Sequence, residues 1–306
     1  MLRHWGALLI AVVCLGAGSA KDYTADWRFM GIVQPQVTVG PRQEPNFRWR
    51  RIRGIATGPI TENLKAKFQV NLDPDTGFLS LMDAFLDYTP IKAPVRLNLQ
   101  GGLLMPYWAM EGGTFANTVN YSYMVALLRL WERTAGVQAT ARFANAYELT
   151  GAILNGAASF NDNNELPNYL LSVTTVQPWF DARAWYYKGK DGPYGAETST
   201  DITGCEITNA RVGRFTGNAA FIGSNRRNVR MLGGYVEAMY QLSKQNSVIA
   251  KFDWADANRD QPARALQRYI GCYRQRLTPW MDSFWEVEYD QKLNDANFLF
   301  RGDARF

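Results

Sequence analysis

Apolar and polar residues alternate with a period of two along most of the chain. In the last segment, ANFLFRGDARF, the even positions from Ala296 to Phe306 are apolar or small, and the odd positions from Asn297 to Arg305 are mostly polar or charged. The segment LKAKFQVNLD repeats the pattern, with its apolar residues opposing lysines and polar amides. Because successive strand side chains point to opposite faces, each such segment predicts a strand with one apolar and one polar face.

Two architectures share this period, a soluble β-sandwich and a transmembrane β-barrel. Three features favour the barrel. Charged residues occupy the polar faces at mid-strand, aromatic residues gather near the ends of the apolar faces, and tight turns alternate with longer loops. We therefore predict an all-β fold, a transmembrane antiparallel β-barrel with short periplasmic turns and long extracellular loops.

The number of alternating segments predicts fourteen strands. They span 27–39, 46–58, 64–73, 80–88, 95–105, 134–143, 147–156, 168–176, 179–188, 231–242, 247–256, 268–277, 281–291 and 296–306. An even number places both termini in the periplasm. The least regular stretch is 189–230, where the segment NARVGRFTGNAAFIG would add a hairpin and raise the number to sixteen.

The first twenty residues have the pattern of a secretory signal peptide. Arg3 precedes an apolar run, and the run is followed by small residues that end at Ala20. The apolar run is about half the ~20 residues that a membrane-spanning helix needs. We expect 1–20 to be cleaved and 21–306 to form one barrel domain in the outer membrane of a Gram-negative bacterium.

The expected mature chain contains no histidine, because His4 is the only one in the sequence. Serine and cysteine nucleophile systems need an imidazole base, and two cysteines cannot complete a zinc site. The sequence therefore argues against an enzyme, a cofactor or a metal, and a net charge of +5 is too small to indicate a nucleic-acid partner. Export permits a disulfide between Cys205 and Cys272, which would pin the longest loop to the inner wall.

If the apolar faces meet lipid, the polar faces line the lumen. The basic residues expected there are Arg48, Arg50, Arg51, Arg53, Lys65, Lys67, Arg96, Arg142, Arg274 and Arg276. The acidic residues are Asp83, Asp87, Asp282, Glu286, Glu288 and Asp290. Further charges of the same parity are Arg183, Arg301, Arg305, Asp181, Asp253 and Asp303. Arginine-rich walls favour anions, so we expect a weak anion preference; the alternative is that these charges only solvate the lumen and pair with one another.

The stretch FRWRRIRG interrupts the alternation. Strict period two after Trp49 would point Arg51 and Arg53 into lipid. A bulge near Arg50–Arg51 would insert one residue and reset the phase, which turns all four arginines toward the lumen. In the alternative, Arg51 and Arg53 stay outside, at a subunit contact or extended toward lipid phosphates.

The segment 106–133 predicts a long third extracellular loop. It contains YSYMVALLRLWER, in which large apolar residues recur at helical spacing. A short helix folded into the barrel would bury them against the wall and narrow the pore, with Glu111, Arg129, Glu132 and Arg133 at the constriction. A lid over the mouth or a subunit contact remains the alternative.

The order of several motifs resembles a known family. FRWRRIRGIATGPITENLKAKFQVNLD, LMDAFLDYTP and VRLNLQGGLLMPY follow one another near the N-terminus, and RYIGCYRQRLTPWMDSFWEVEYD precedes a last strand that closes on Phe306. They are similar to the phosphate-selective porin O/P family of bacterial outer membranes, at both ends of the chain but weakly over about 157–230. The resemblance implies a channel, assembly into a homotrimer, contact with outer-membrane lipid and lipopolysaccharide, and recognition of Phe306 by the barrel assembly machinery.

The expected function is passive diffusion of small hydrophilic solutes, small anions among them, through a water-filled channel. The family's phosphate site uses lysines of an inward-folded loop, whereas the corresponding loop here offers Lys188 and Lys190 at its start, so the preferred anion stays open. A structural or binding barrel, such as an adhesin or a sheath for a partner protein, remains the alternative function.

Overall fold

The computed structural model describes residues 26–41, 43–73, 76–106, 118, 122–130, 132–144, 146–155, 167–191, 198–260 and 265–306. The expected signal peptide, 1–20, and the expected constriction residue Glu111 lie outside these ranges. No helix in the described ranges is long and apolar enough to cross a membrane.

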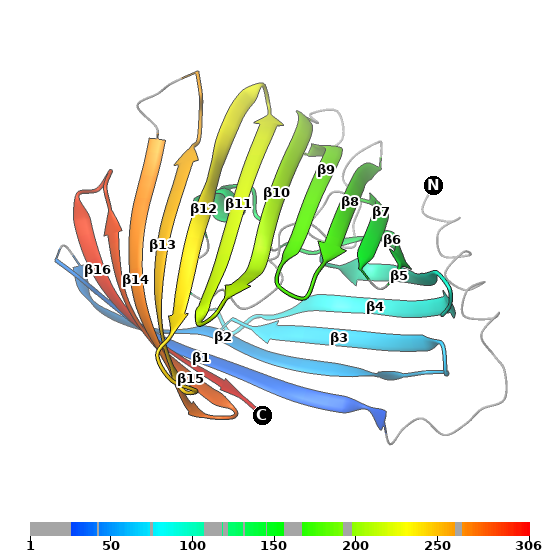
Figure 1. Cartoon of the computed structure of the whole chain (residues 1–306), viewed down its shortest axis with the longest axis horizontal. Helices are drawn as coiled ribbons and strands as arrows, with labels where there is room; N and C mark the ends of the chain where they lie inside the picture. The colour runs from blue at the N-terminus through cyan, green and yellow to red at the C-terminus, as the bar shows by residue number, and fades with distance from the viewer. Residues whose placement is uncertain are drawn as a thin grey trace.

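The described chain forms one closed antiparallel β-barrel of sixteen strands, in which each strand pairs with its sequence neighbours and β1 pairs with β16 (Figure 1). The first eight strands are β1 (Arg28–Gly40), β2 (Gln43–Pro59), β3 (Leu64–Leu72), β4 (Leu79–Ile91), β5 (Arg96–Leu104), β6 (Thr134–Phe143), β7 (Tyr147–Leu154) and β8 (Asn168–Val176). The others are β9 (Asp181–Asp191), β10 (Thr198–Val212), β11 (Phe215–Arg226), β12 (Val229–Gln241), β13 (Asn246–Asp256), β14 (Ala265–Thr278), β15 (Met281–Asp290) and β16 (Asp295–Arg305). One short helix, α3 (Tyr123–Leu127), lies between β5 and β6 in sequence.

The prediction of fourteen strands is wrong. The two additional strands are β10 and β11, and they form a hairpin within 189–230, where the alternation is least regular. Ile202 on β10 and Ile222 on β11 both point inward and are buried, while Asp201 and Asn225 lie on the outer face. In this part of the hairpin, apolar residues therefore face inward and polar residues face outward. The other strands have the opposite arrangement, so the sequence pattern that identified them is absent here.

The connections between strands differ between the two ends of the barrel. At one end, which we call the short-turn end, the seven connections contain two to four residues each. The other end, the long-loop end, carries the connections 105–133 and 155–167. Because β1 begins and β16 ends at the short-turn end, both ends of the described barrel lie there.

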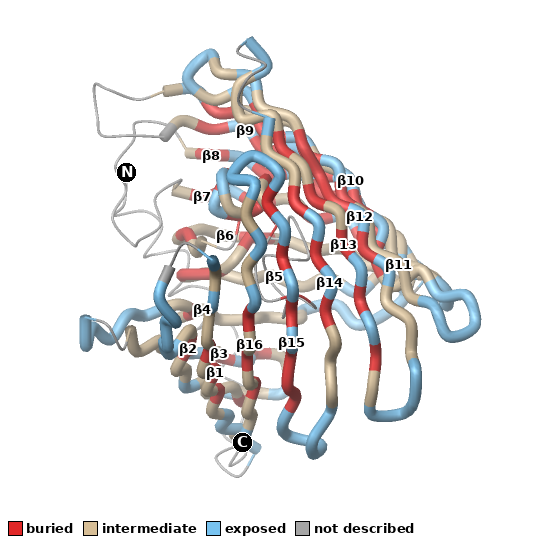
Figure 2. Tube along the Cα trace, turned by 90° about the vertical axis from the view of Figure 1, so that its left-hand side faces the viewer, coloured by how far each residue is buried: buried red, intermediate tan, exposed pale blue. Residues whose placement is uncertain are grey.

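The two faces of the sheet differ sharply in exposure. Along β14 and β15, buried positions alternate with more exposed ones (Figure 2). On β15, Asp282, Phe284 and Glu286 are buried on the inner face, and Trp285 and Val287 are exposed on the outer face. On these strands the outer face is therefore largely apolar, and the inner face holds most of the charge.

Aromatic side chains pack against one another on the outer face. Trp285 of β15 contacts both Phe298 and Phe300 of β16, with ring centres 6.2 and 4.7 Å apart. At the short-turn end, Phe306 exchanges two backbone hydrogen bonds with Gly31, N–O distances 2.6 and 3.1 Å, which extend the seam between β1 and β16. The Phe306 ring covers Gly31, where any larger residue would collide with it.

The predicted bulge in β2 is confirmed. Gln34 of β1 pairs with Arg51, and the next residue, Pro35, pairs with Trp49, so Arg50 is the additional residue. The register then places Arg51 and Arg53 on the inner face with Gln34, as predicted. Pro35 has no N–H to donate, which suits a position where the ladder is interrupted.

The disulfide that export would permit is not formed, because Cys205 and Cys272 are both free thiols. Cys205 lies in β10 rather than in a loop, and it is exposed on the outer face opposite Phe221. Cys272 is buried on the inner face of β14. Four strand spacings, roughly 19 Å, separate the two strands, well beyond the Cα distance of about 7 Å that a disulfide tolerates.

The close approach of β5 to β4 at Gly102 can be tested by substitution. Its φ is +133°, and a Cβ there would lie 2.3 Å from the carbonyl oxygen of Ala84. We expect Gly102→Ala to destabilise the barrel by about 1–3 kcal/mol, measured by urea unfolding in lipid vesicles with heat-modifiable gel mobility as the readout. Gly151→Ala is the matched control, since no heavy atom lies within 4 Å of its added Cβ. Equal unfolding midpoints for the two variants would contradict the prediction.

Candidate pore and its inner loop

The pairing register places most of the expected pore residues on the inner face. The basic residues there are Arg48, Arg51, Arg53, Lys65, Lys67, Arg96, Arg142, Arg274 and Arg276. The acidic residues there are Asp83, Asp87, Asp282, Glu286, Glu288 and Asp290. Arg50, the additional residue of the bulge, has no position in the register.

The acidic side chains of the inner face are held by neighbouring groups. Asp282 pairs with Arg274 at 2.8 Å and with Arg276 at 3.6 Å. Asp87 accepts hydrogen bonds from the amides of Asn98 and Gln100. The charge of Asp282 is therefore offset by two arginines, and that of Asp87 is stabilised by hydrogen bonds from neutral amides.

A basic wall extends over β16, β1, β2 and β3. Arg301 and Arg305 of β16, Arg51 and Arg53 of β2 and Lys65 of β3 share its inner face. Between them, β1 contributes the buried amides of Gln34 and Gln36 and no carboxylate. The guanidinium of Arg53 donates to the amide oxygen of Asn71 at 3.2 Å. On β16, Asp303 lies 2.8 Å from Arg301 and offsets part of this positive charge.

We call the connection 105–133 the inner loop, because its described residues lie against the inner face. Thr118 is completely buried. Its carbonyl oxygen accepts from Arg301 Nη1 of β16 at 3.0 Å, and its hydroxyl accepts from Lys251 Nζ of β13 at 3.4 Å. Two charged residues of the wall thus fix one point of the loop deep inside the barrel.

Tyr123 fixes a second point. Its backbone N–H donates to both carboxylate oxygens of Asp253, at 2.9 and 3.1 Å, and its hydroxyl donates to Asp290. The guanidinium carbon of Arg268 lies 4.5 Å from the centre of the Tyr123 ring, and Arg268 also pairs with Asp253 at 2.7 Å and with Glu288 at 3.2 Å. Burial and the bond to Asp290 raise the pKa of Tyr123, so the phenol remains a protonated donor.

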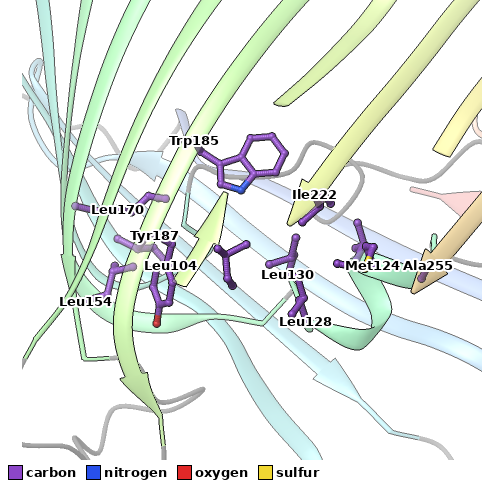
Figure 3. Packing of buried hydrophobic residues seen from close by; sticks show 13 residues of the cluster. Leu104, Met124, Leu128, Leu130, Leu154, Leu170, Trp185, Tyr187, Ile222 and Ala255 are labelled. Carbon is purple, nitrogen blue, oxygen red and sulfur yellow. The ribbon is translucent and has the colours of Figure 1, made fainter. Parts of the chain in front are cut away.

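Apolar packing holds the loop between these polar contacts. Met124, Val125 and Leu130 are completely buried, and Leu128 nearly so. They pack among inward-facing apolar residues of seven strands (Figure 3), namely Leu104, Ala152, Leu154, Leu170, Trp185, Tyr187, Ile202, Ile222 and Ala255. Helical spacing in the sequence predicts this packing, although the helix itself has only one turn, Tyr123–Leu127.

The end of the loop reaches the opposite side of the inner face. Arg133 Nε donates to Asp83 of β4 at 2.8 Å, and Lys67 of β3 pairs with the same carboxylate at 2.7 Å. Of the other expected constriction residues, Arg129 and Glu132 pair with each other at 3.1 Å. The described part of the loop therefore contacts β13, β16 and β4, and so spans the lumen.

Several residues that hold the loop were missing from the expected set. Arg268 has the parity of Cys272, Arg274 and Arg276, and parity alone could have identified it. Lys251 could have been found in the same way, from Asp253 two residues later. Nothing in the local sequence of Thr118 marks it as an anchor, because its contacts are with β13 and β16, more than a hundred residues away.

The packing of the inner loop can be tested at α3. We expect Met124→Ala to loosen the loop, because truncating a fully buried methionine costs about 2–5 kcal/mol. Trypsin cleavage after Arg129, whose side chain is exposed, should then become faster in the reconstituted barrel. Leu127→Ala is the matched control, since Leu127 lies in the same turn but is exposed. Equal cleavage rates for the two variants would count against a loop held by this packing.

The sequence matches no protein-family model and no curated protein. Solved structures, in contrast, resemble the barrel over nearly its whole length. An anion-selective porin from Comamonas acidovorans has a TM-score of 0.71 at 11% identity and covers 92% of this chain and 99% of its own. The trimer form of OmpT, an outer membrane protein of Vibrio cholerae, scores 0.68 at 10% identity with the same coverage. The outer membrane channel DcaP of Acinetobacter baumannii scores 0.65 at 10% identity and covers 94% of this chain and 100% of its own. The chain thus has the sixteen-stranded barrel fold of bacterial outer-membrane porins.

Proposed function

We propose that this chain is an outer-membrane porin of a Gram-negative bacterium, exported through a cleaved signal peptide at 1–20. It forms a water-filled channel for passive diffusion of small hydrophilic solutes, narrowed by the inner loop and weakly selective for anions. The observation that carries the proposal is the attachment of the inner loop to both sides of the lumen, through Thr118 and Tyr123 on one side and Arg133 on the other.

The distribution of charge supports the anion preference. The carboxylates Asp83, Asp253 and Asp282 each have an arginine partner within 3 Å. In the basic wall, Arg51 lies beside strand β1, and Arg48 of the same strand β2 faces the lumen next to it. The inner face of β1 itself presents the amides of Gln34 and Gln36 and no carboxylate. An anion in the lumen near this wall would be stabilised, as it is near rings of basic side chains in other pores. One of the similar structures is an anion-selective porin by its description.

The inner loop also favours a passive channel over a sheath for a partner protein. A sheath through which a partner protein passes needs a wide lumen, whereas the loop fills part of this one with the packed residues around Met124 and Leu130. A passive channel tolerates the loop and gains a size limit from it. Assembly into a homotrimer belongs to the proposal because one similar structure is a trimer form, and recognition of Phe306 by the assembly machinery belongs to it as a prediction from the resemblance.

Charge selectivity provides the first test. In planar bilayers with a salt gradient, the wild-type reversal potential should indicate preference for the anion. We expect Arg48→Gln combined with Arg51→Gln to lower the anion-to-cation permeability ratio at least roughly twofold, the effect of removing a unit charge about 8 Å from the ion in water. Lys92→Gln is the control, because Lys92 lies in a short turn and pairs with Glu62. A wild-type channel that prefers cations would overturn the anion preference, and comparison of phosphate, sulfate and chloride would identify the preferred anion.

The constriction provides the second test. Deleting residues 112–130 removes the anchored and packed parts of the inner loop, including Thr118 and α3. We expect the single-channel conductance to rise and liposomes to admit larger sugars in swelling assays. A folded deletion variant with unchanged conductance would show that the loop does not limit the pore.

A further inference from the structure

Exposed charge at the short-turn end of the barrel is mostly positive. The exposed basic residues in its turns and strand ends are Arg28, Lys65, Lys92, Arg96, Arg211, Arg214, Lys244 and Arg276. Among the described residues of this end, the exposed acidic ones are Asp26 and Glu62. A solute or protein that approaches the short-turn end therefore meets an excess of accessible positive charge.

The excess is densest on one side of the mouth, from β1 to β6. Five basic residues follow one another there, at the start of β1, β3 and β5, in the turn after β4 and near the end of β6. We call them the mouth arc: Arg28, Lys65, Lys92, Arg96 and Arg142. Five strand spacings, roughly 24 Å, separate β1 from β6. The mouth arc is therefore much wider than a small anion.

Two arginines of the mouth arc lie directly opposite each other. The register pairs Arg96 of β5 with Arg142 of β6, and like charges in opposed positions are destabilising. Arg142 Nε donates to the buried carboxylate of Glu148 at 2.7 Å. Arg96 is exposed and has neither an ion pair nor a side-chain hydrogen bond among the described residues. An acidic group from outside the chain would relieve this repulsion.

The other members of the mouth arc are accessible as well. Arg28 and Lys65 are exposed, and the described part of the chain provides no ion pair for either of them. Lys92 pairs with Glu62 at 3.0 Å, but both side chains are exposed. Because such surface pairs contribute little stability, Lys92 can exchange its partner at small cost.

We propose that the mouth arc docks an acidic segment of a periplasmic protein. This inference rests on the proposed outer-membrane location, which places the short-turn end in the periplasm. Carboxylates of the segment bridge Arg96 and Arg142 and contact Arg28 and Lys65, and guanidinium groups bind carboxylates through strong, charge-assisted hydrogen bonds.

The width of the mouth arc and its charge select this partner. A small anion reaches one or two of the five cations at a time, whereas an acidic chain reaches all of them. A second copy of this chain, docked end to end, would present the same positive excess and be repelled. Complementary charge also speeds the encounter of two proteins.

The test removes two charges of the mouth arc that lack an ion pair. The variant is Arg28→Gln with Arg96→Gln, and the matched control is Arg214→Gln with Lys244→Gln, two exposed basic residues in the turns after β10 and β12. The full barrel in phosphatidylcholine nanodiscs, which leave both ends accessible, is titrated with a peptide of aspartate and glutamate fused to a folded carrier protein. A second fusion carries asparagine and glutamine instead.

We expect the Arg28/Arg96 variant to lose at least roughly fourfold in affinity for the acidic fusion, about twofold for each guanidinium with one carboxylate about 8 Å away in water. The Arg214/Lys244 control should bind more nearly as the wild type does in physiological salt, where charges more than about 8 Å apart are largely screened. The amide fusion should bind weakly to all three proteins.

Three outcomes would overturn the inference. They are no binding of the acidic fusion to the wild type, equal binding of the acidic and amide fusions, and equal losses in the Arg28/Arg96 variant and the control. Retention of the wild type on purified cell-wall sacculi, lost in the Arg28/Arg96 variant and without binding of the acidic fusion, would assign the surface to the cell wall instead.

Conductance without any fusion protein separates this inference from the proposed function. The wild type in planar phosphatidylcholine bilayers should conduct whether or not it binds the acidic fusion. A wild type that fails to conduct would reject the channel, whatever its affinity for the fusion. A conducting wild type that does not bind the acidic fusion would reject only the docking site.

Discussion

Closure of the sheet is the constraint on which the rest of this structure depends. A strand edge presents unpaired backbone N–H and C=O groups, and here β1 pairs with β16, so that every strand is bonded on both sides. Closure gives the sheet an inside and an outside, and period-two alternation then decides which side chains face the lumen and which face outward. The bulge at Arg50 follows from the same constraint, because without it Arg51 and Arg53 would lie on the outer face.

The charges gathered inside by closure also position the inner loop. Arg301, Lys251 and Asp253 are almost completely buried, and each binds a described residue of the loop. Such charges are stable in the interior only when partnered. Thr118 and Tyr123 of the loop provide some of these partners, and the same contacts hold the loop against the barrel wall. Barrel wall and inner loop are therefore held together by the same contacts, and a change in an anchor residue would alter the position of the loop as well as the charge of the lumen.

The sequence was sufficient for the strands that obey one pattern. Fourteen alternating segments correspond to strands, the bulge was located from a single phase error, and the loop was recognised from the helical spacing around Met124. The hairpin β10–β11 was left out of the fourteen strands, although 189–230 was named as the stretch that could add one, because Ile202 and Ile222 face inward, against the inner loop, a contact that local alternation cannot reveal. The assignment of Cys205 to a loop was wrong for the same reason, since it lies in β10, and the disulfide with Cys272 that the sequence left possible is not formed.

In the hairpin β10–β11, apolar side chains face inward and polar ones face outward, and the inner loop accounts for this exchange. Near the long-loop end, the inner loop makes the lumen apolar, so β9 to β11 turn Tyr187, Ile202 and Ile222 inward. The alternating positions on these strands then carry polar residues, and these lie on the outer face as Lys188 and Asp201. These outward charges lie near the rim of the long-loop end, whereas a few residues deeper the same strands return to the ordinary arrangement, with Arg183 and Glu206 inside. The packing of the inner loop and the polar outer surface at Lys188 and Asp201 are consequently on opposite sides of the same strands.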